Sequence, residues 1–158
     1  MAQEVYSSDE LILGDELFVY INTGTEETPI WSPLAYSTSC SLNLSSDTID
    51  SSNKMSGVWT AALPGKLSWS ISTEALMSYN TTGYGYFFEK LVARTPFLLK
   101  FGQVKNLSTG DFSADDTKTY YTGKAYCSSC NLTADNGSVS SMSIEFTGDG
   151  ALTKSKAA

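Results

Sequence analysis

The sequence contains no histidine among its 158 residues. Histidine is the commonest general base and metal ligand near neutral pH, so no Ser-His-Asp or Cys-His catalytic arrangement can form. Paired carboxylates occur, Asp115 with Asp116 and Glu26 with Glu27, but both pairs lie in polar segments where solvated surface acids are the ordinary interpretation. No GxGxxG or P-loop motif is present. The sequence therefore predicts a protein that is not an enzyme.

Cysteine is also scarce, with three residues: Cys40, Cys127 and Cys130. The C-S-S-C segment has no second CxxC and no histidine to complete a four-ligand zinc site. Residues three apart in a regular strand point to opposite faces, so Cys127 and Cys130 could pair only across a bulge or bend. We expect three free thiols, and neither a metal nor another cofactor.

Basic residues are few: the sequence has 10 lysines and arginines against 17 acidic residues, so its formal net charge is −7. This balance disfavours a protein that grips nucleic-acid phosphates through a basic face. No apolar run approaches the roughly 18 residues of a membrane helix. The N-terminal residues also lack the basic and then apolar order of a signal peptide. We therefore expect synthesis and folding in a cytoplasm, without a membrane partner.

Alternating apolar and polar residues are the main structural signal. Segments 35–44, 66–72 and 138–147 each place apolar side chains on one face and small polar ones on the other, which is typical of strands packed on one side. The outward positions that carry hydroxyl or carboxylate groups are Ser37, Ser39, Ser41, Ser68, Ser70, Ser72, Ser141, Ser143 and Glu145.

A long polar segment, residues 45–64, joins the first two of these strands. Two residues are enough for a hairpin turn, and connections of about twenty residues in a compact domain are usually functional or disordered. The residues of interest in it are Asp47, Asp50 and Lys54, followed by the apolar Met55, Val58 and Trp59. Because such an apolar tip is costly to leave in water, we interpret the segment as an arm that contacts a neighbouring subunit. The alternative is an arm folded back on its own domain.

One helix is predicted at about residues 84–94. Tyr84, Phe87, Phe88, Leu91 and Val92 recur at helical spacing, and Pro96 ends the pattern. Together with six or seven strands in hairpins, this predicts a mainly β protein: an antiparallel β-sandwich or small barrel with one flanking helix. We expect a single domain over residues 1–158, with flexible segments at 1–10 and 152–158.

Several motifs in this order resemble the major tail tube proteins of long, non-contractile-tailed phages, especially those of phages and prophages of Bacteroides-type bacteria. The most specific are A-x-S-T-S-C-S-L, D-T-I-D-S-S-N-K and P-G-K-L-S-W-S-I within residues 35–72; F-T-G-D-G-A-L near the end is a weaker match. The resemblance covers about residues 13–153. It implies a sandwich or barrel with one helix, six copies in a ring, and rings stacked into a virion tail assembled in the host cytoplasm.

The resemblance also implies the partners, which are further copies of the chain, a tape measure protein and tail-end proteins. Genomic DNA would pass through the channel without specific binding. We expect the nine outward hydroxyl and carboxylate positions to face this channel, where hydroxyls and scattered carboxylates would not retain a polyanion. The alternative function is a secreted or surface β-sandwich that binds glycan or host protein. Outward serines argue against it, although Tyr120, Tyr121 and Tyr126 leave open an aromatic binding face.

Overall fold

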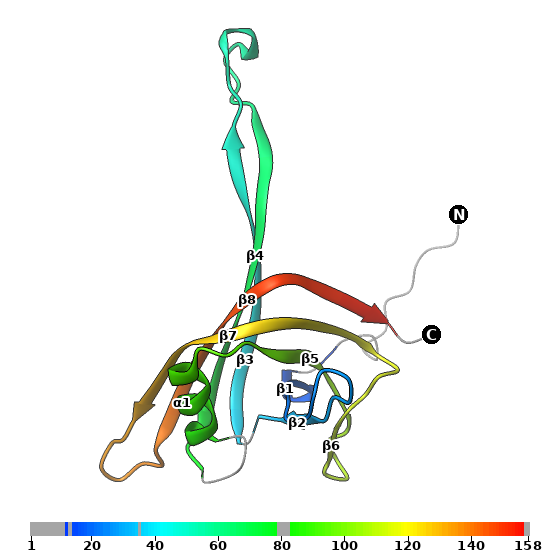
Figure 1. Cartoon of the computed structure of the whole chain (residues 1–158), viewed down its shortest axis with the longest axis vertical. Coiled ribbons are helices and arrows are strands. Elements are labelled where there is room, and N and C mark those ends of the chain that lie inside the picture. Colours follow the sequence, from blue (N-terminus) through cyan, green and yellow to red (C-terminus); the bar gives the residue numbers. More distant parts are fainter. Residues whose placement is uncertain (1–11, 13, 35, 79–82, 157–158) are drawn as a thin grey trace.

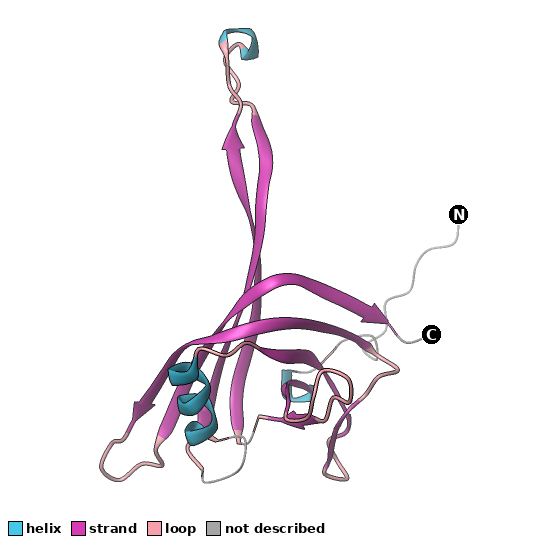
Figure 2. Cartoon of the chain, viewed as in Figure 1, coloured by secondary structure: helices cyan, strands magenta, loops and turns pink. Residues whose placement is uncertain are grey.

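The protein is described by a computed structural model that covers residues 12, 14–34, 36–78 and 83–156. These residues form one α-helix, two short 3-10 helices and a single antiparallel sheet (Figures 1 and 2). The strands are β1 Leu17–Asn22, β2 Trp31–Pro33, β3 Ser37–Asp50, β4 Ala62–Leu76, β5 Phe97–Asn106, β6 Asp111–Ala114, β7 Thr119–Thr133 and β8 Ser141–Lys156. The 3-10 helices span Gly14–Glu16 and Lys54–Ser56, and the α-helix α1 spans Tyr84–Ala93.

The sheet has the strand order β2-β1-β5-β7-β8-β4-β3, and β6 pairs with β5. The predicted mainly β, antiparallel fold with one helix is confirmed. However, the strands form one open sheet rather than two packed sheets or a closed barrel. The sheet curls so that its distant strands approach each other, and the Cys40 Sγ of β3 donates to the Leu17 carbonyl of β1 at 3.5 Å. One curved sheet can therefore enclose a core on its concave side.

The core lies between this concave side and α1. Its fully buried side chains come from most of the strands and from the helix; they include Val19, Ile21, Leu99, Ile71, Ile144, Phe146 and Phe87. Phe87 of α1 packs edge-on against Phe146 of β8, with ring centroids 5.5 Å apart. Burying each such side chain contributes about 1.5–3 kcal/mol. Tyr84, Tyr86 and Leu91 of the helix also pack against this core, and the Tyr84 hydroxyl donates to the Cys130 carbonyl of β7 at 3.4 Å.

The predicted helix at about 84–94 is confirmed at Tyr84–Ala93. Arg94 adopts a left-handed conformation (φ 55°), and its N–H donates to the Leu91 carbonyl at 3.3 Å, which caps the last turn. Only part of the predicted apolar stripe is buried, because Phe88 and Val92 are exposed whereas Phe87 is fully covered. Packing on the sheet therefore explains the apolar residues on only one side of this helix.

Trp69 of β4 fixes how β8 crosses the core. Its indole ring lies directly over Gly148 of β8 and Gly123 of β7, where any Cβ would overlap the ring. The indole Nε1 donates to the Gly150 carbonyl at 3.0 Å, and Gly150 has the positive φ of 85° that glycine adopts without strain. In the F-T-G-D-G-A-L motif, Gly148 is therefore needed for packing against Trp69, and Gly150 for its positive φ.

The β3–β4 hairpin forms a long arm, which stands away from the rest of the molecule in Figure 1. β4 pairs with β8 only from Ser70 to Leu76, whereas its pairing with β3 continues outward to Asp50 and Ala62. The expected arm over 45–64 is present, and the two strands continue into it over residues 45–50 and 62–64. Only residues 51–61 connect them. Alternation is irregular here because a bulge between Ser46 and Thr48 shifts the register.

The C-terminal segment also differs from the prediction. We expected residues 152–158 to be flexible, but residues 152–156 belong to β8, and residues 153–156 pair with Thr119–Thr122 of β7. Leu152 packs against the core. Residues 157 and 158, and the predicted flexible segment 1–10, lie outside the described residues.

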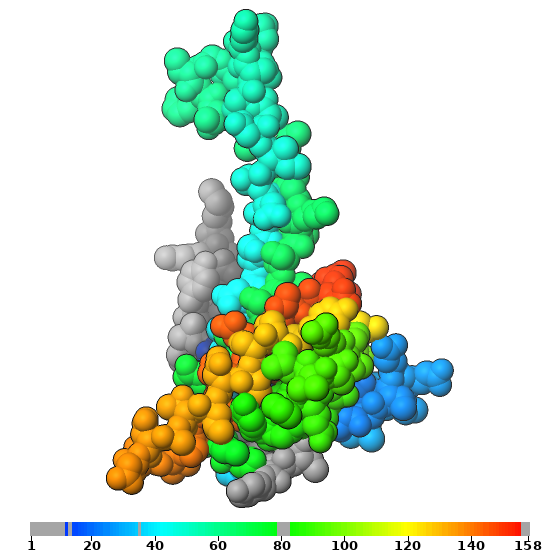
Figure 3. Space-filling view, turned by 60° about the vertical axis from the view of Figure 1, so that its left-hand side comes forward, coloured from blue at the N-terminus to red at the C-terminus, as the bar shows by residue number. Residues whose placement is uncertain are grey.

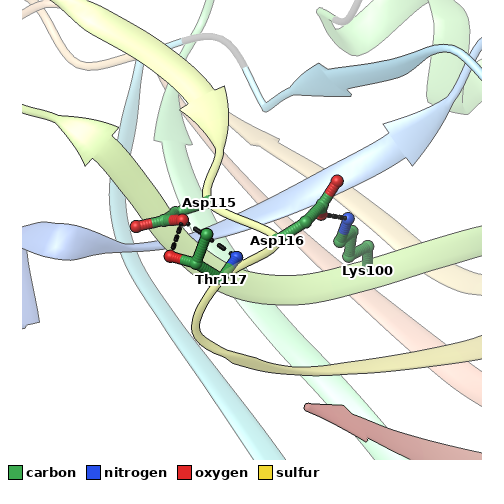
Figure 4. A network of polar contacts seen from close by, with 4 residues as sticks. All are labelled: Lys100, Asp115, Asp116 and Thr117. Atoms are coloured by element: carbon green, nitrogen blue, oxygen red, sulfur yellow. Dashed lines mark hydrogen bonds and ion pairs between the residues drawn. The ribbon is translucent and has the colours of Figure 1, made fainter. Parts of the chain in front are cut away.

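A small polar and aromatic cluster surrounds Lys100 of β5, and Figure 4 shows its polar members Lys100, Asp115, Asp116 and Thr117. Lys100 of β5 is buried, with an exposed fraction of 3%, and its Nζ contacts the Asp116 carboxylate. The same Nζ lies 4.0 Å from the ring centroid of Tyr120. Beside it, Asp115 accepts two hydrogen bonds from Thr117, which lower the pKa of that carboxyl. These contacts hold the β6–β7 connection against the sheet.

We predict that Gly148→Ala destabilises the protein by about 1–3 kcal/mol, because the added methyl group must displace the Trp69 indole. Gly85→Ala in α1 is the control, since nothing lies within 4 Å of its position. It should leave stability unchanged or raise it by about 0.5–1 kcal/mol. Urea denaturation of both variants measures the difference, and equal effects would contradict the packing assigned to Trp69.

We also predict that Asp116→Asn destabilises the protein by about 1–3 kcal/mol, because it leaves the buried Lys100 ammonium without its carboxylate. Adding Lys100→Met to that variant should recover most of the loss, since an uncharged side chain needs no partner. The exposed Asp135 provides the control, and Asp135→Asn should change stability by less than about 0.5 kcal/mol. Thermal denaturation compares the four proteins. A double variant less stable than Asp116→Asn would contradict this interpretation.

Candidate assembly surfaces

The described residues contain no cluster of three or more histidine, cysteine, aspartate or glutamate side chains that could hold a metal ion. In the same part of the chain, no helix is long and apolar enough to cross a membrane. Asp116 contacts Lys100 and Asp115 accepts hydrogen bonds from Thr117, which are the structural contacts described above. The features that remain to be explained are surfaces: one polar sheet face and one projecting arm.

Four strands align their polar side chains in rows on the side of the sheet opposite the core. The register places Ser41 beside Ser72 and Ser72 beside Glu145, across β3, β4 and β8. Parallel to this row run Asn43–Ser70–Thr147–Tyr126 and Ser39–Glu74–Ser143–Asn131, which include β7. We call the surface made by these three rows, together with Ser45, Ser68, Ser128 and Ser141, the hydroxyl face.

Eight of the nine residues predicted to face a channel lie on the hydroxyl face. The exception is Ser37. A bulge between Ser37 and Ser39 places Ser37 opposite Ala75, whose side chain points into the core. Ser68 lies at the root of the arm, beyond the pairing with β8, and its Oγ is 2.9 Å from Ser45 Oγ.

The sequence interpretation missed the contribution of β7 to this face. Ser128 and Asn131 belong to it although they are three residues apart, because a bulge between Cys127 and Ser129 interrupts the alternation. The same bulge brings Cys127 and Cys130 to the core side, opposite Phe146 and Ile144. Both thiols are free, and burial raises the pKa of Cys127 to about 12 and also raises the pKa of Cys130. A two-residue alternation cannot reveal such a bulge, so sequence alone had no signal for it.

Charge on the hydroxyl face is sparse and mostly negative. Glu74 and Glu145 contribute carboxylates to it. Next to the face, Lys124 of β7 lies opposite Asp149 of β8, and the Lys124 Nζ is 3.1 Å from Glu26 Oε1. The aromatic surface proposed for glycan stacking does not form. Tyr121 lies on the core side and Tyr120 is packed against Lys100, which leaves Tyr126 as the exposed tyrosine of the three.

The tip of the arm, residues 51–61, is a shaped structure with exposed apolar side chains. Asn53 accepts a hydrogen bond from Met55 N at 2.8 Å, and its own N–H donates to Ser56 Oγ at 3.0 Å, which forms a capping box. The exposed fractions of Met55, Val58 and Trp59 are 93%, 95% and 81%. Figure 3 shows this tip far from the body, so the alternative of an arm folded back on its own domain is wrong.

The other predicted arm residues lie along the same hairpin. Asp47 and Asp50 are exposed on β3, and Lys54 begins the 3-10 turn at the tip. Asp50 accepts a hydrogen bond from Ser52 N at 2.8 Å, and this bond lowers the pKa of its carboxyl. The arm therefore presents an ordered tip with apolar side chains, one cation and nearby carboxylates.

Known structures share this fold. The chain is similar to a protein in the virion of a gene transfer agent particle, with 16% identity, a TM-score of 0.70 and coverage of 92% of this chain and 99% of that one. It is also similar to the tail tube protein of SPP1 (11% identity, TM-score 0.67, 93% and 80% covered). A third similar chain belongs to the sheath–tube complex of the extracellular contractile injection system PVC (13% identity, TM-score 0.66, 95% of each chain covered).

A comparison with curated proteins gives no match. The family model for the phage tail tube protein, in contrast, matches residues 12–154, which include the hydroxyl face, the arm and α1. This range is nearly the whole chain and agrees with the resemblance seen in its motifs. The chain therefore belongs to the phage tail tube protein family and is a structural component of a virion tail.

Proposed function

We propose that six copies of the chain form a ring, and that rings stack into a channel through which the genome passes. The observation that carries this proposal is the hydroxyl face, which runs across four strands and has unpaired strand edges on both sides. The tail of a gene transfer agent, whose subunit has a similar fold, was solved with six-fold symmetry. This symmetry supports the same copy number here.

Two strand edges support ring closure: the outer side of β3, and β7 beyond Ala125, where the Tyr84 hydroxyl of α1 donates to the Cys130 carbonyl at 3.4 Å. Among the described residues, no strand pairs with the outer side of β3, and none pairs with β7 between Tyr126 and Thr133 except β8. Pairing β3 of one copy with this half of β7 in the next would continue the hydroxyl face from copy to copy. Such a head-to-tail contact closes into a ring when its rotation fits. Closure also removes edges that would otherwise promote aggregation.

The hydroxyl face suits the lining of a DNA channel. Duplex DNA carries about one charge per 1.7 Å, so a basic lining would bind it at every step. A ring of six copies would have a formal charge of 6 × −7 = −42, and the rows of the hydroxyl face carry serines and carboxylates rather than unpaired lysines. We infer that the eight predicted serine and glutamate positions on this face line the channel and that the lining does not retain DNA.

The remaining partners follow from this role. A tape measure protein would occupy the channel before the genome, and tail-end proteins would begin and terminate the stack. The arm would contact a neighbouring copy, because its apolar tip has no cover in the described chain. A Bacteroides-type host stays a prediction. A glycan-binding function is less well supported, since Tyr126 alone cannot form an aromatic platform.

We predict that replacing residues 51–61 with a two-residue turn yields a folded, monomeric protein that no longer forms tubes. The arm contributes no side chain to the core, so the variant should keep the unfolding midpoint of the parent. Negative-stain electron microscopy of the concentrated proteins compares assembly. Normal tubes from the shortened protein would show that the arm is dispensable.

We predict that Glu145→Lys slows DNA ejection from phage particles built with the variant subunit, because it places six cations around each ring. Glu27→Lys is the matched control, since it makes the same change of charge in the exposed loop between β1 and β2. Both variants should assemble. Ejection kinetics measured with a DNA-binding dye distinguish them, and equal rates would argue against a channel position for Glu145.

A further inference from the structure

We propose that the arm tip of one copy docks on the exposed side of α1 in a copy of the adjacent ring. The proposal rests on the stacked rings proposed above and names the surface that receives the arm. The exposed side of α1 consists of Phe88 and Val92, one helical turn apart, with Tyr84 stacked on Phe88 at a centroid distance of 6.4 Å.

This side of the helix lacks a partner in the described chain. The exposed fractions of Phe88 and Val92 are 52% and 66%, although the neighbouring Phe87 is fully buried. Tyr84 and Leu91, which continue this apolar strip, are half-buried and pack against the core. An apolar strip of this kind on a short amphipathic helix is wider than the sheet requires, which favours a second contact.

The arm tip is chemically suited to that strip. Its capping box fixes the backbone, so Met55, Val58 and Trp59 are displayed on a preformed turn rather than on a flexible loop. Preorganisation reduces the entropy lost on docking. Methionine and tryptophan also make favourable contacts with aromatic rings such as Phe88. Both surfaces are apolar, and each would cover the other.

Charges at the two surfaces are complementary. Lys54 is the one basic residue within 51–61, and it has no ion pair among the described residues. Glu89 follows Phe88 on α1, is exposed, and likewise has no ion pair in this part of the chain. Lys90 is directed elsewhere, with its Nζ 5.4 Å from the Tyr86 ring centroid. A Lys54–Glu89 pair at the rim would set the register of docking.

The shape of the molecule places the two surfaces at opposite ends. In Figure 1 the arm tip is at the top of the longest axis and α1 is near the bottom. β3 extends by the seven residues 44–50 beyond the part of the hairpin that pairs with β8, a span of about 20 Å at the rise of a strand. Barrel strands tilt by about 35–45° from the barrel axis, so the arm would extend about 15 Å past its own ring.

A second copy is therefore the occupant that fits best. An arm that leaves its ring along the axis reaches the next ring, and the same head-to-tail contact would repeat in every ring and cover both surfaces each time. A different protein at α1 would leave the tip uncovered along the whole tube. The copies within one ring, in contrast, are joined through the edges of β3 and β7.

Disulfide cross-linking tests this contact. Val58→Cys combined with Val92→Cys should give a ladder of covalent oligomers when preformed tubes are oxidised. The matched control combines Val58→Cys with Val139→Cys, because Val139 is equally apolar and exposed but lies in the β7–β8 connection outside α1. A ladder with Val139 and not with Val92, or tubes that give neither ladder, would overturn the docking site. Failure to form tubes at all would instead count against the proposed function.

Charge exchange supplies a second test without cysteine. Lys54→Glu and Glu89→Lys should each raise severalfold the protein concentration needed for tubes, and the double variant should restore the parental concentration. Both positions are exposed, so folding should be unaffected, which circular dichroism checks. A double variant that assembles no better than the worse single variant would contradict the pairing of these two residues.

Discussion

The structure depends on the strict separation of the two sides of four strands, β3, β4, β8 and β7. Trp69, Ile71, Ile144 and Phe146 face the core, while their sequence neighbours form the rows of the hydroxyl face. A slip of one residue in any of these strands would exchange the two sets of side chains. The same alternation therefore stabilises the monomer and produces the surface that the assembled tube would present to DNA.

The monomer is correspondingly incomplete. Its sheet ends in unpaired edges, its arm carries apolar side chains into solvent, and one side of α1 is uncovered in the described chain. Each of these features is costly for a free protein, since open edges and apolar patches promote association. In the proposed stack of rings, all of them would become contacts between copies. Assembly would thus account for features that the fold alone leaves unexplained.

Much of this could be predicted from the sequence. Alternation identified the core and outward faces of β3, β4 and β8, and the spacing of Phe87 and Leu91 identified α1. The bulges at Ser37–Ser39 and Cys127–Ser129 could not be predicted, because they change which residues share a face without changing composition. The extension of β3 and β4 into the arm could not be predicted, because two strands without a core beneath them need no apolar alternation. The Lys100–Asp116 contact depends on how the β6–β7 connection folds over the sheet.

Hydrogen–deuterium exchange of the free chain and of assembled tubes tests the central claim most directly, because backbone amides at a newly paired edge become protected. The account predicts slower exchange in tubes for residues 39–46 of β3 and 126–133 of β7, with little change in the buried strand β5. Edges of β3 and β7 that exchange as fast in tubes as in the free chain would contradict it.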